Sequence, residues 1–243
     1  MSNISFKNGF TLSEVLVTIG IIGVVAGITL PSVIKKHQRK EAEVRLQKAY
    51  SIISQAFLRA QSKYGEIKDW TNWDDAEDIL RQYIAPELNN VKIYSKTATS
   101  DRNMMCFEGK LFNGSSSSGN AVKVQYRWMT NIYISTPFLI NNTASIKLTD
   151  GTCIGLNNKN GGEDNSQLLF IDTNGSSQGP NIAGYDLFFF VVVENNIKPV
   201  GYNWTSYALT DASKTHACNP KSPAGGMVCA AKVMSDSWKI KYW

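Results

Sequence analysis

The stretch GFTLSEVLVTIGIIGVVAGITLP, at residues 9–31 of this 243-residue chain, decides the fold that the sequence predicts. Residues 15–30 carry no charged side chain. The run from residue 10 to residue 30 is about as long as the roughly 20 residues that a helix needs to cross about 30 Å of hydrocarbon. Glu14 is the one charged residue in that run. The stretch therefore predicts a membrane-spanning helix with a carboxylate near its beginning.

A secretory signal peptide and an ordinary membrane anchor are the two common explanations of such a segment. A signal peptide ends its apolar core in a small-x-small cleavage site, whereas Leu30 here leads into PSVIKK at residues 31–36. An ordinary anchor leaves Glu14 unexplained, because a carboxylate drawn to the bilayer centre costs about 2.5–3.5 kcal/mol. A cut between Gly9 and Phe10 would supply the missing partner, since it creates a terminal amine near the membrane surface.

The order of residues from Gly9 through Glu14 to Pro31 closely resembles the cleavage and methylation motif of type IV prepilins and type II secretion pseudopilins. The resemblance implies that a prepilin peptidase cuts after Gly9 and methylates the amine of Phe10. Glu14 then becomes the fifth residue of the mature chain and pairs with the terminal amine of a neighbouring subunit. A pair with Phe10 of the same chain is also open, because residues four apart share a helical face. Pro31 falls where type IV pilins often carry a helix-kinking proline.

Small residues within the span offer a surface for helix packing. Gly20, Gly23 and Gly27 include one Gly-x-x-x-Gly pair, which would let another helix approach closely. Glycine is also simply frequent in membrane helices, so both explanations stay open. The resemblance adds that residues 23–31 can lose helical order in filaments of this family.

Two features depart from the motif. Asn8, and not a basic residue, precedes Gly9, although Lys7 stands one place earlier. The basic residues after the span outnumber Lys7, and loop charge alone would put that flank in the cytoplasm. They are Lys35, Lys36, Arg39 and Lys40. Because the cleavage site and Glu14 both match, we expect the motif to decide orientation and the head to lie in the periplasm.

The rest of the chain predicts an α+β fold. Apolar residues continue at helical spacing from Pro31 to Tyr64, with Gly65 as the expected stop, and a short helix is expected from Asn72 or Asp74 to Pro86. Short strands are expected over residues 122–129, 146–148, 153–156, 168–171, 187–193 and 198–202, with turns at residues 150–151 and 194–196. This order matches the pilin plan of a long N-terminal helix packed on an antiparallel β-sheet head. A free coiled-coil stalk is disfavoured because no heptad repeat is sustained.

The expected organisation has four parts. Residues 1–9 form the prepilin leader, residues 10–31 the transmembrane and polymerisation helix, residues 32–64 its amphipathic continuation, and residues 65–243 the globular head. The formal net charge is +5 and falls to +4 without the leader, whose only charged side chain is Lys7. That excess does not by itself indicate nucleic acid as a partner.

The four cysteines all follow the apolar run, and no two form a Cys-x-x-Cys pair. Disulfides are expected if this region is exported. Three pairings exist, and close spacing favours Cys218 with Cys229, which leaves Cys106 with Cys153. A zinc site that uses His216 is the alternative, although its spacing lacks the usual paired ligands.

One loop offers ligands for a metal ion. Asp172 and Asn174, in the sequence DTNG, lead through Gly-Pro-Asn to Asp186 and bring hard oxygen atoms together, for which calcium is the natural ion. The Asp-x-Asn-Gly fragment resembles the C-terminal loop in which some secretion pseudopilins bind calcium. A turn held by aspartate and asparagine side chains is the plainer explanation.

No nucleophile motif, phosphate loop or metal-hydrolase spacing is present, so no enzymatic activity is expected. The expected role is that of a single-pass inner-membrane precursor that becomes a subunit of a type IV pilus or secretion pseudopilus. Its partners would be the prepilin peptidase, other pilin or pseudopilin subunits, an inner-membrane assembly platform and membrane lipid. The rival is a minor pilin or tethered binding protein that captures DNA or a surface ligand through aromatic side chains. The aromatic candidates are Trp204, Tyr207, Trp238, Tyr242 and Trp243.

Overall fold

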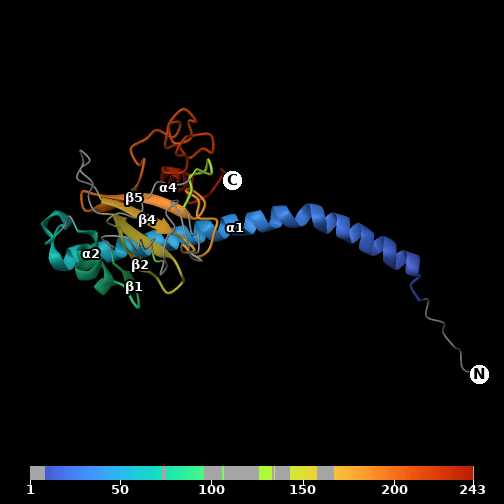
Figure 1. Cartoon of the computed structure of the whole chain (residues 1–243), viewed down its shortest axis with the longest axis horizontal. Coiled ribbons are helices and arrows are strands. Elements are labelled where there is room, and N and C mark those ends of the chain that lie inside the picture. The colour runs from blue at the N-terminus through green and yellow to red at the C-terminus, as the bar shows by residue number, and fades with distance from the viewer. Residues whose placement is uncertain are drawn as a thin grey trace, which may run out of the picture. The chain divides into compact units, whose positions relative to one another are not determined.

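The chain begins with one long helix and continues into a sheet (Figure 1). The computed structural model describes residues 9–72, 75–95, 106, 126–132, 134, 143–157 and 167–242. Helix α1 (Leu12–Tyr64) is 53 residues long. By its internal contacts the chain divides into residues 1–41 and residues 42–243, so the second half of α1 belongs to the same unit as the sheet.

In the first unit, α1 runs through Pro31 without a break. The loss of helical order that the resemblance allows in filaments stays a prediction. Its apolar side chains lie open, as for Ile28, which is 74% exposed. Among the described residues, α1 is the one helix long and apolar enough to cross a membrane. A signal sequence would meet the same test, so the choice between the two rests on the motif at its beginning.

In the second unit, α1 buries a stripe of residues at helical spacing. These are Ala42, Glu43, Leu46, Ala49, Ile53, Ala56, Phe57 and Ala60. The helix ends where Gly65 takes a φ of +85°, a conformation that glycine adopts without steric cost. The Gly65 N–H donates to the carbonyl of Gln61 at 2.9 Å, and the stop predicted there is confirmed.

Short helical segments follow α1. They are η1 (Ile67–Asp69), α2 (Ala76–Asp78), η2 (Ile79–Ile84) and η3 (Ala85–Glu87). Asp75 begins α2 by accepting hydrogen bonds from the N–H groups of Glu77 and Asp78 at 2.9 and 3.3 Å. The helix predicted before Pro86 is confirmed, although η2 has π-helical hydrogen bonding that the apolar pattern did not indicate.

Six strands form one antiparallel sheet whose spatial order is the chain order. They are β1 (Lys92–Tyr94), β2 (Thr143–Lys147), β3 (Cys153–Asn157), β4 (Gln167–Asp172), β5 (Leu187–Val193) and β6 (Asn196–Pro199). Both predicted turns are confirmed. Gly151 N–H donates to the carbonyl of Leu148 at 3.0 Å between β2 and β3, and Glu194 and Asn195 both have positive φ between β5 and β6, as a type I′ turn requires.

Two predicted strands differ from the structure. Of residues 122–129, only 126–129 are described, and there Arg127 forms an isolated bridge with Ile182. β6 ends at Pro199. The Val200 N–H still donates to the carbonyl of Phe189 at 3.1 Å, but the Tyr202 N–H donates to the carbonyl of Pro199 at 3.0 Å and turns the chain away from the sheet. β1 and helix α4 (Cys229–Ser235) were not predicted. The predicted flexible loop at residues 115–118 lies outside the described residues.

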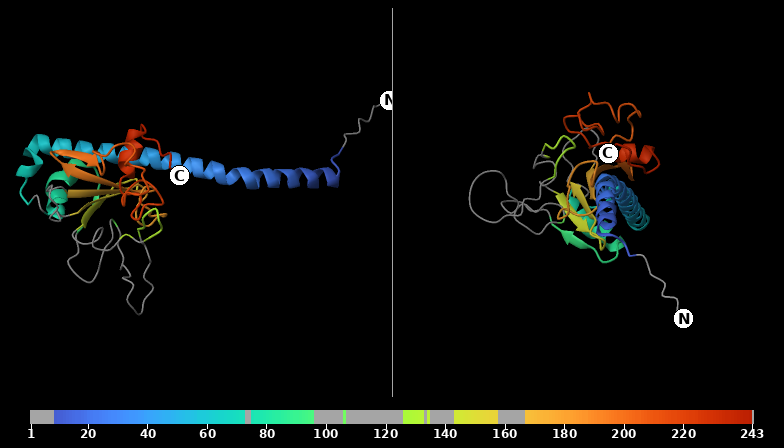
Figure 2. Two further views of the ribbon diagram at one scale, coloured as in Figure 1. Left: turned by 90° about the horizontal axis from the view of Figure 1, so that it is seen from above. Right: turned by 90° about the vertical axis from the view of Figure 1, so that its right-hand side faces the viewer.

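Neighbouring residues of a strand point to opposite faces of the sheet, and here side chains on both faces are buried. In β5, Phe188 and Phe190 pack in the core that contains the second half of α1. Phe189 packs in a second core with Tyr126 and Phe170. The second half of α1 runs along one face of the sheet, as two further views show (Figure 2).

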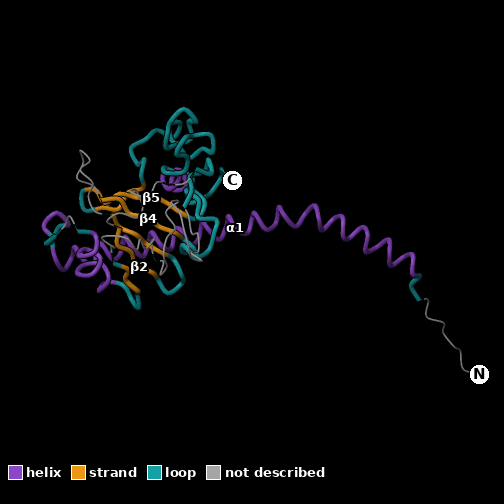
Figure 3. The backbone as a smooth tube through the Cα atoms, viewed as in Figure 1, coloured by secondary structure: helices purple, strands orange, loops and turns teal. Residues whose placement is uncertain are grey.

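A long irregular region follows β6. Residues 200–228 pass through successive turns before α4 and the final residues (Figure 3). Gly226 seats this region closely against the loop before β5, since an added Cβ at Gly226 would lie 2.5 Å from the carbonyl oxygen of Ala183. A side chain at that position would force the two segments apart.

Candidate functional site

The predicted cleavage motif leads directly into the first turn of α1. The Thr11 N–H and hydroxyl both donate to Glu14 Oε2 at 2.8 Å, and the Glu14 N–H donates to Thr11 Oγ1 at 3.3 Å. This reciprocal capping box satisfies donors that otherwise lack partners at the start of a helix. All of its groups come after Gly9. A cut between Gly9 and Phe10 would therefore leave the helix start intact.

The two residues at the predicted cut are open. Phe10 is 89% exposed, and an added Cβ at Gly9 would meet no atom within 4 Å. The folded chain thus does not require glycine at position 9. Any such requirement would come from the peptidase that recognises the cleavage site. Gly23 and Gly27 likewise have no atom within 4 Å of an added Cβ, so their predicted packing role would need another chain.

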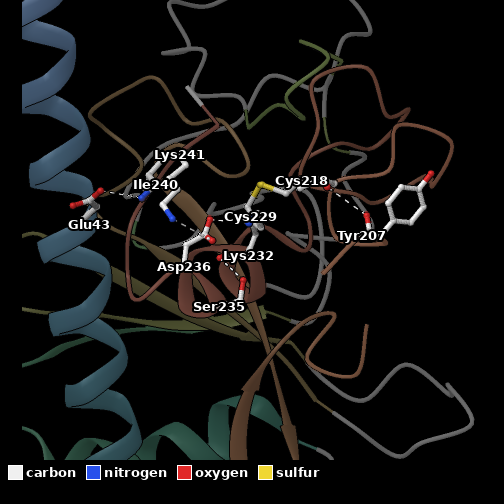
Figure 4. Close-up of polar contacts among 10 residues, drawn as sticks. Glu43, Tyr207, Cys218, Cys229, Lys232, Ser235, Asp236, Ile240 and Lys241 are labelled. Carbon is white, nitrogen blue, oxygen red and sulfur yellow. Dashed lines mark hydrogen bonds and ion pairs between the residues drawn. A yellow bond between two sulfur atoms is a disulfide. The ribbon is translucent and has the colours of Figure 1, made fainter. Parts of the chain in front are cut away.

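Residues near the end of the chain contact α1 through hydrogen bonds to Glu43 (Figure 4). Glu43 is 6% exposed, and its Oε1 accepts from the Ile240 N–H at 2.9 Å while its Oε2 lies 3.4 Å from Lys239 Nζ. Asp236 contacts Lys232 and Lys241 at 2.8 and 3.5 Å. We call residues 236–242 the C-terminal strap. The contact role of Glu43 was not predicted, although Glu43 stands three residues before Leu46 on the apolar face of α1.

Both predicted cysteine pairs are joined as disulfides. Cys106 is bonded to Cys153 and Cys218 to Cys229, across 47 and 11 positions of sequence. This is the pairing that close spacing favoured. None of the four is free, so no thiolate remains for a zinc ion beside His216. His216 is exposed, with its ring 6.5 Å from that of Trp128.

A buried acid pair lies at the predicted calcium loop. Asp172 and Asp186 are 0% and 3% exposed. Asp172 accepts hydrogen bonds from the Tyr126 hydroxyl and from the N–H of Gly175 at 2.8 Å, while Asp186 accepts from the N–H of Asn181 at 2.7 Å. Burial and the nearby charge of Asp186 raise the pKa of Asp172 to about 7, and burial raises the pKa of Asp186 to about 6.

The same loop has unused oxygen atoms. The Oδ1 atoms of Asn174 and Asn181 are buried and accept no hydrogen bond. Amide and carboxylate oxygen atoms of this kind are the ligands that calcium prefers. Within the described ranges, however, no three His, Cys, Asp or Glu residues converge as metal ligands would. The two carboxylates can reduce their mutual electrostatic repulsion by sharing one proton. That this loop binds a calcium ion stays a prediction.

We predict that stability falls as pH rises through the range of these two pKa values. Each folded-state pKa lies above its ordinary value of 3.8, so the native chain binds more protons than the unfolded chain between about pH 4 and 7. The melting temperature should therefore be several degrees higher at pH 5.5 than at pH 8, measured by circular dichroism. Asp186→Asn should flatten this slope because it removes the like charge beside Asp172.

Asp69→Asn, at an exposed position, is the matched control and should keep the slope. If the control and Asp186→Asn have equal slopes, the acid pair does not set the pH dependence. Calcium added at pH 8 should raise the melting temperature of the natural chain and not that of Asp186→Asn. If calcium raised the melting temperature of both chains equally, this loop would be excluded as its binding site.

A groove of about 290 Å³ lies along the second half of α1. Lys48 and Asp150 face each other there at 2.7 Å, and Arg59 lies 3.7 Å from Glu87. The charges on its walls are thus paired with each other. Among the described residues that line it, none is a histidine, cysteine or serine.

The aromatic residues suggested for ligand capture mostly pack inward. Trp204 and Trp238 lie against the core, and the Tyr242 hydroxyl donates to the carbonyl of Gly184 at 2.6 Å. Tyr207 is 76% exposed, and Trp243 lies outside the described residues. Among the described candidates, Tyr207 alone has the exposure that a binding aromatic needs.

Comparison with known proteins locates two families along the chain. Residues 4–30 match the prokaryotic N-terminal methylation motif, the prepilin-type signal for cleavage and methylation. Residues 32–242 match a family of unknown function, DUF6613. No curated protein and no solved structure matches the chain. Because the second match covers most of its residues, the chain belongs to the family of unknown function DUF6613, preceded by a prepilin-type methylation motif.

Proposed function

We propose that the processed chain is a structural subunit of a type IV pilus or of a type II secretion pseudopilus. The observation that carries the proposal is the methylation motif at residues 4–30, which opens into a helix of exposed apolar side chains. A pilin-like precursor needs both features, because the signal directs processing and the helix drives polymerisation. The long helix and antiparallel sheet agree with this role.

The proposed assembly step depends on the charge that cleavage creates. Hydrolysis of the Gly9–Phe10 peptide bond would leave a carboxylate on the leader and an ammonium group on Phe10. In hydrocarbon, two opposite charges attract far more strongly than in water, because little solvent screens them. The Glu14 carboxylate of one subunit would pair with the Phe10 amine of its neighbour and would fix the register between the two helices.

The proposed location is the inner membrane, with one span and the head in the periplasm, and afterwards the filament. Two disulfides in the head support an oxidising compartment, where such bonds persist. The proposed partners are a prepilin peptidase, related subunits and a membrane assembly platform. A minor subunit that captures DNA or another ligand is less well supported, because most of its aromatic candidates pack into the core.

Mass spectrometry of the native protein tests the proposal. We expect the first residue to be Phe10 with one added methyl group on its amine. A Gly9→Val chain, in which the residue before the cut is branched, should keep Met1 and should be absent from filaments. A native protein that begins at Met1, or that begins after residue 30, would contradict the proposal. Copy number in purified filaments would then separate a major subunit from a minor one.

A further inference from the structure

A cationic segment directly follows the apolar part of α1. Its members are Lys35, Lys36, Arg39 and Lys40. The side chains of Lys35, Lys36 and Lys40 are exposed. Arg39 is half-buried. If the head is exported, these charges lie on the side of the membrane that loop charge disfavours. The proposed function does not explain this placement.

The helix holds these four side chains on one side. At about 100° per residue, they span an arc of about 140° around the axis. Glu41 projects about 100° beyond Lys40, outside that arc. Because α1 continues without a break through Pro31, the arc keeps a fixed direction relative to the apolar residues before it.

The distance from the apolar run matches the position of lipid headgroups. Lys35 lies five residues after Leu30, and at 1.5 Å per residue this places it about 7.5 Å beyond the run. The headgroup layer occupies roughly 5–8 Å on each side of the hydrocarbon. Arg39 and Lys40 lie about 14–15 Å out. Helical side chains tilt toward the N-terminus, so the long stem of the exposed Lys40 can reach back toward the bilayer, whereas Arg39 is half-buried with its Nε covered.

We propose that this cationic arc binds the phosphates of anionic phospholipids on the exported face of the membrane. Clusters of lysine and arginine side chains directly beside a membrane span are a common means by which proteins recognise such headgroups. The proposal rests on the proposed membrane span and adds the lipid class that the span selects. Bound anionic lipid would also offset the unfavourable charge of this flank.

The test uses the full chain reconstituted in vesicles of equal parts phosphatidylglycerol and phosphatidylcholine. Electron spin resonance with a spin label on one lipid or the other gives the relative affinity of each lipid for the protein surface. We expect the natural chain to prefer phosphatidylglycerol by about fivefold or more, which is what one such cation contributes. A chain with Lys35→Gln, Lys36→Gln, Arg39→Gln and Lys40→Gln should lose that preference.

The control variant has the same change in charge at exposed lysines of the second unit, Lys63→Gln, Lys68→Gln, Lys214→Gln and Lys221→Gln. It should keep the lipid preference. An unchanged preference in the arc variant would overturn the proposal, and if filaments were lost at the same time, the arc would belong to a contact with another subunit. A natural chain that fails to enter the vesicles at all would instead contradict the membrane span itself.

Discussion

Glu14→Ala should reduce incorporation into filaments at least tenfold while cleavage after Gly9 and methylation of Phe10 continue. The variant leaves the new amine without a carboxylate, and an unpaired charge in a span costs about 2.5–3.5 kcal/mol. That penalty corresponds to roughly a 70- to 400-fold loss in an equilibrium constant. Quantitative immunoblotting of sheared filaments against total membranes measures the change.

Two matched variants separate the charge of Glu14 from its capping role. Glu14→Gln keeps an oxygen that can accept from Thr11, as capping boxes permit, but removes the negative charge. Thr11→Ala weakens the cap, which is worth about 1 kcal/mol, and keeps the charge. We expect Glu14→Gln to fail like Glu14→Ala and Thr11→Ala to assemble nearly normally. The opposite ranking would mean that helix capping, and not charge pairing, governs assembly.

Loss of the disulfides should destabilise the head by amounts that follow the length of chain each one closes. Across 47 positions, the Cys106–Cys153 bond should contribute about 4 kcal/mol, and across 11 positions the Cys218–Cys229 bond about 3 kcal/mol. Both estimates describe lost freedom of the unfolded chain. Paired Cys→Ser variants, unfolded in guanidinium chloride, measure the difference in free energy of unfolding.

The reduced natural chain is the control for these variants, because reduction removes the bonds without changing side-chain shape elsewhere. It should be less stable than either double variant. If Cys218→Ser/Cys229→Ser proves the more damaging pair, native packing of α4 outweighs the entropy of loop closure. In that case Cys229, which is fully buried at the start of α4, would be the residue to substitute by alanine next.

The sequence predicted features that depend on local chemistry. Gly65 ends α1 because its left-handed backbone favours glycine, and the β2–β3 turn follows from Asp150 and Gly151. Helical spacing likewise predicts that the second half of α1 buries one face, although it did not indicate that Glu43 lies on that face. Such signals need only a few neighbouring residues, so a single sequence contains them.

Features that join distant segments were not predicted. Glu43 meets Ile240 across almost the whole chain, and Tyr126 donates to Asp172 from a segment expected to be a strand. No local pattern specifies such a pair, since each partner alone resembles an ordinary surface residue or an ordinary core residue. At the candidate calcium loop, Asp172 and Asp186 were identified by residue type, but their complete burial depends on tertiary packing.

The C-terminal strap has a mechanical consequence. Tension applied along α1 at residue 42 would load the Glu43 contacts with Ile240 and Lys239 together with the helix–sheet contacts of Leu46 and Ile53. Contacts loaded in parallel must break together, which requires a higher force. Contacts loaded in series break one at a time, each at a lower force. We therefore expect the head to unfold at a higher force when the C-terminal strap, residues 236–242, is present than when it is deleted, which single-molecule force spectroscopy can measure.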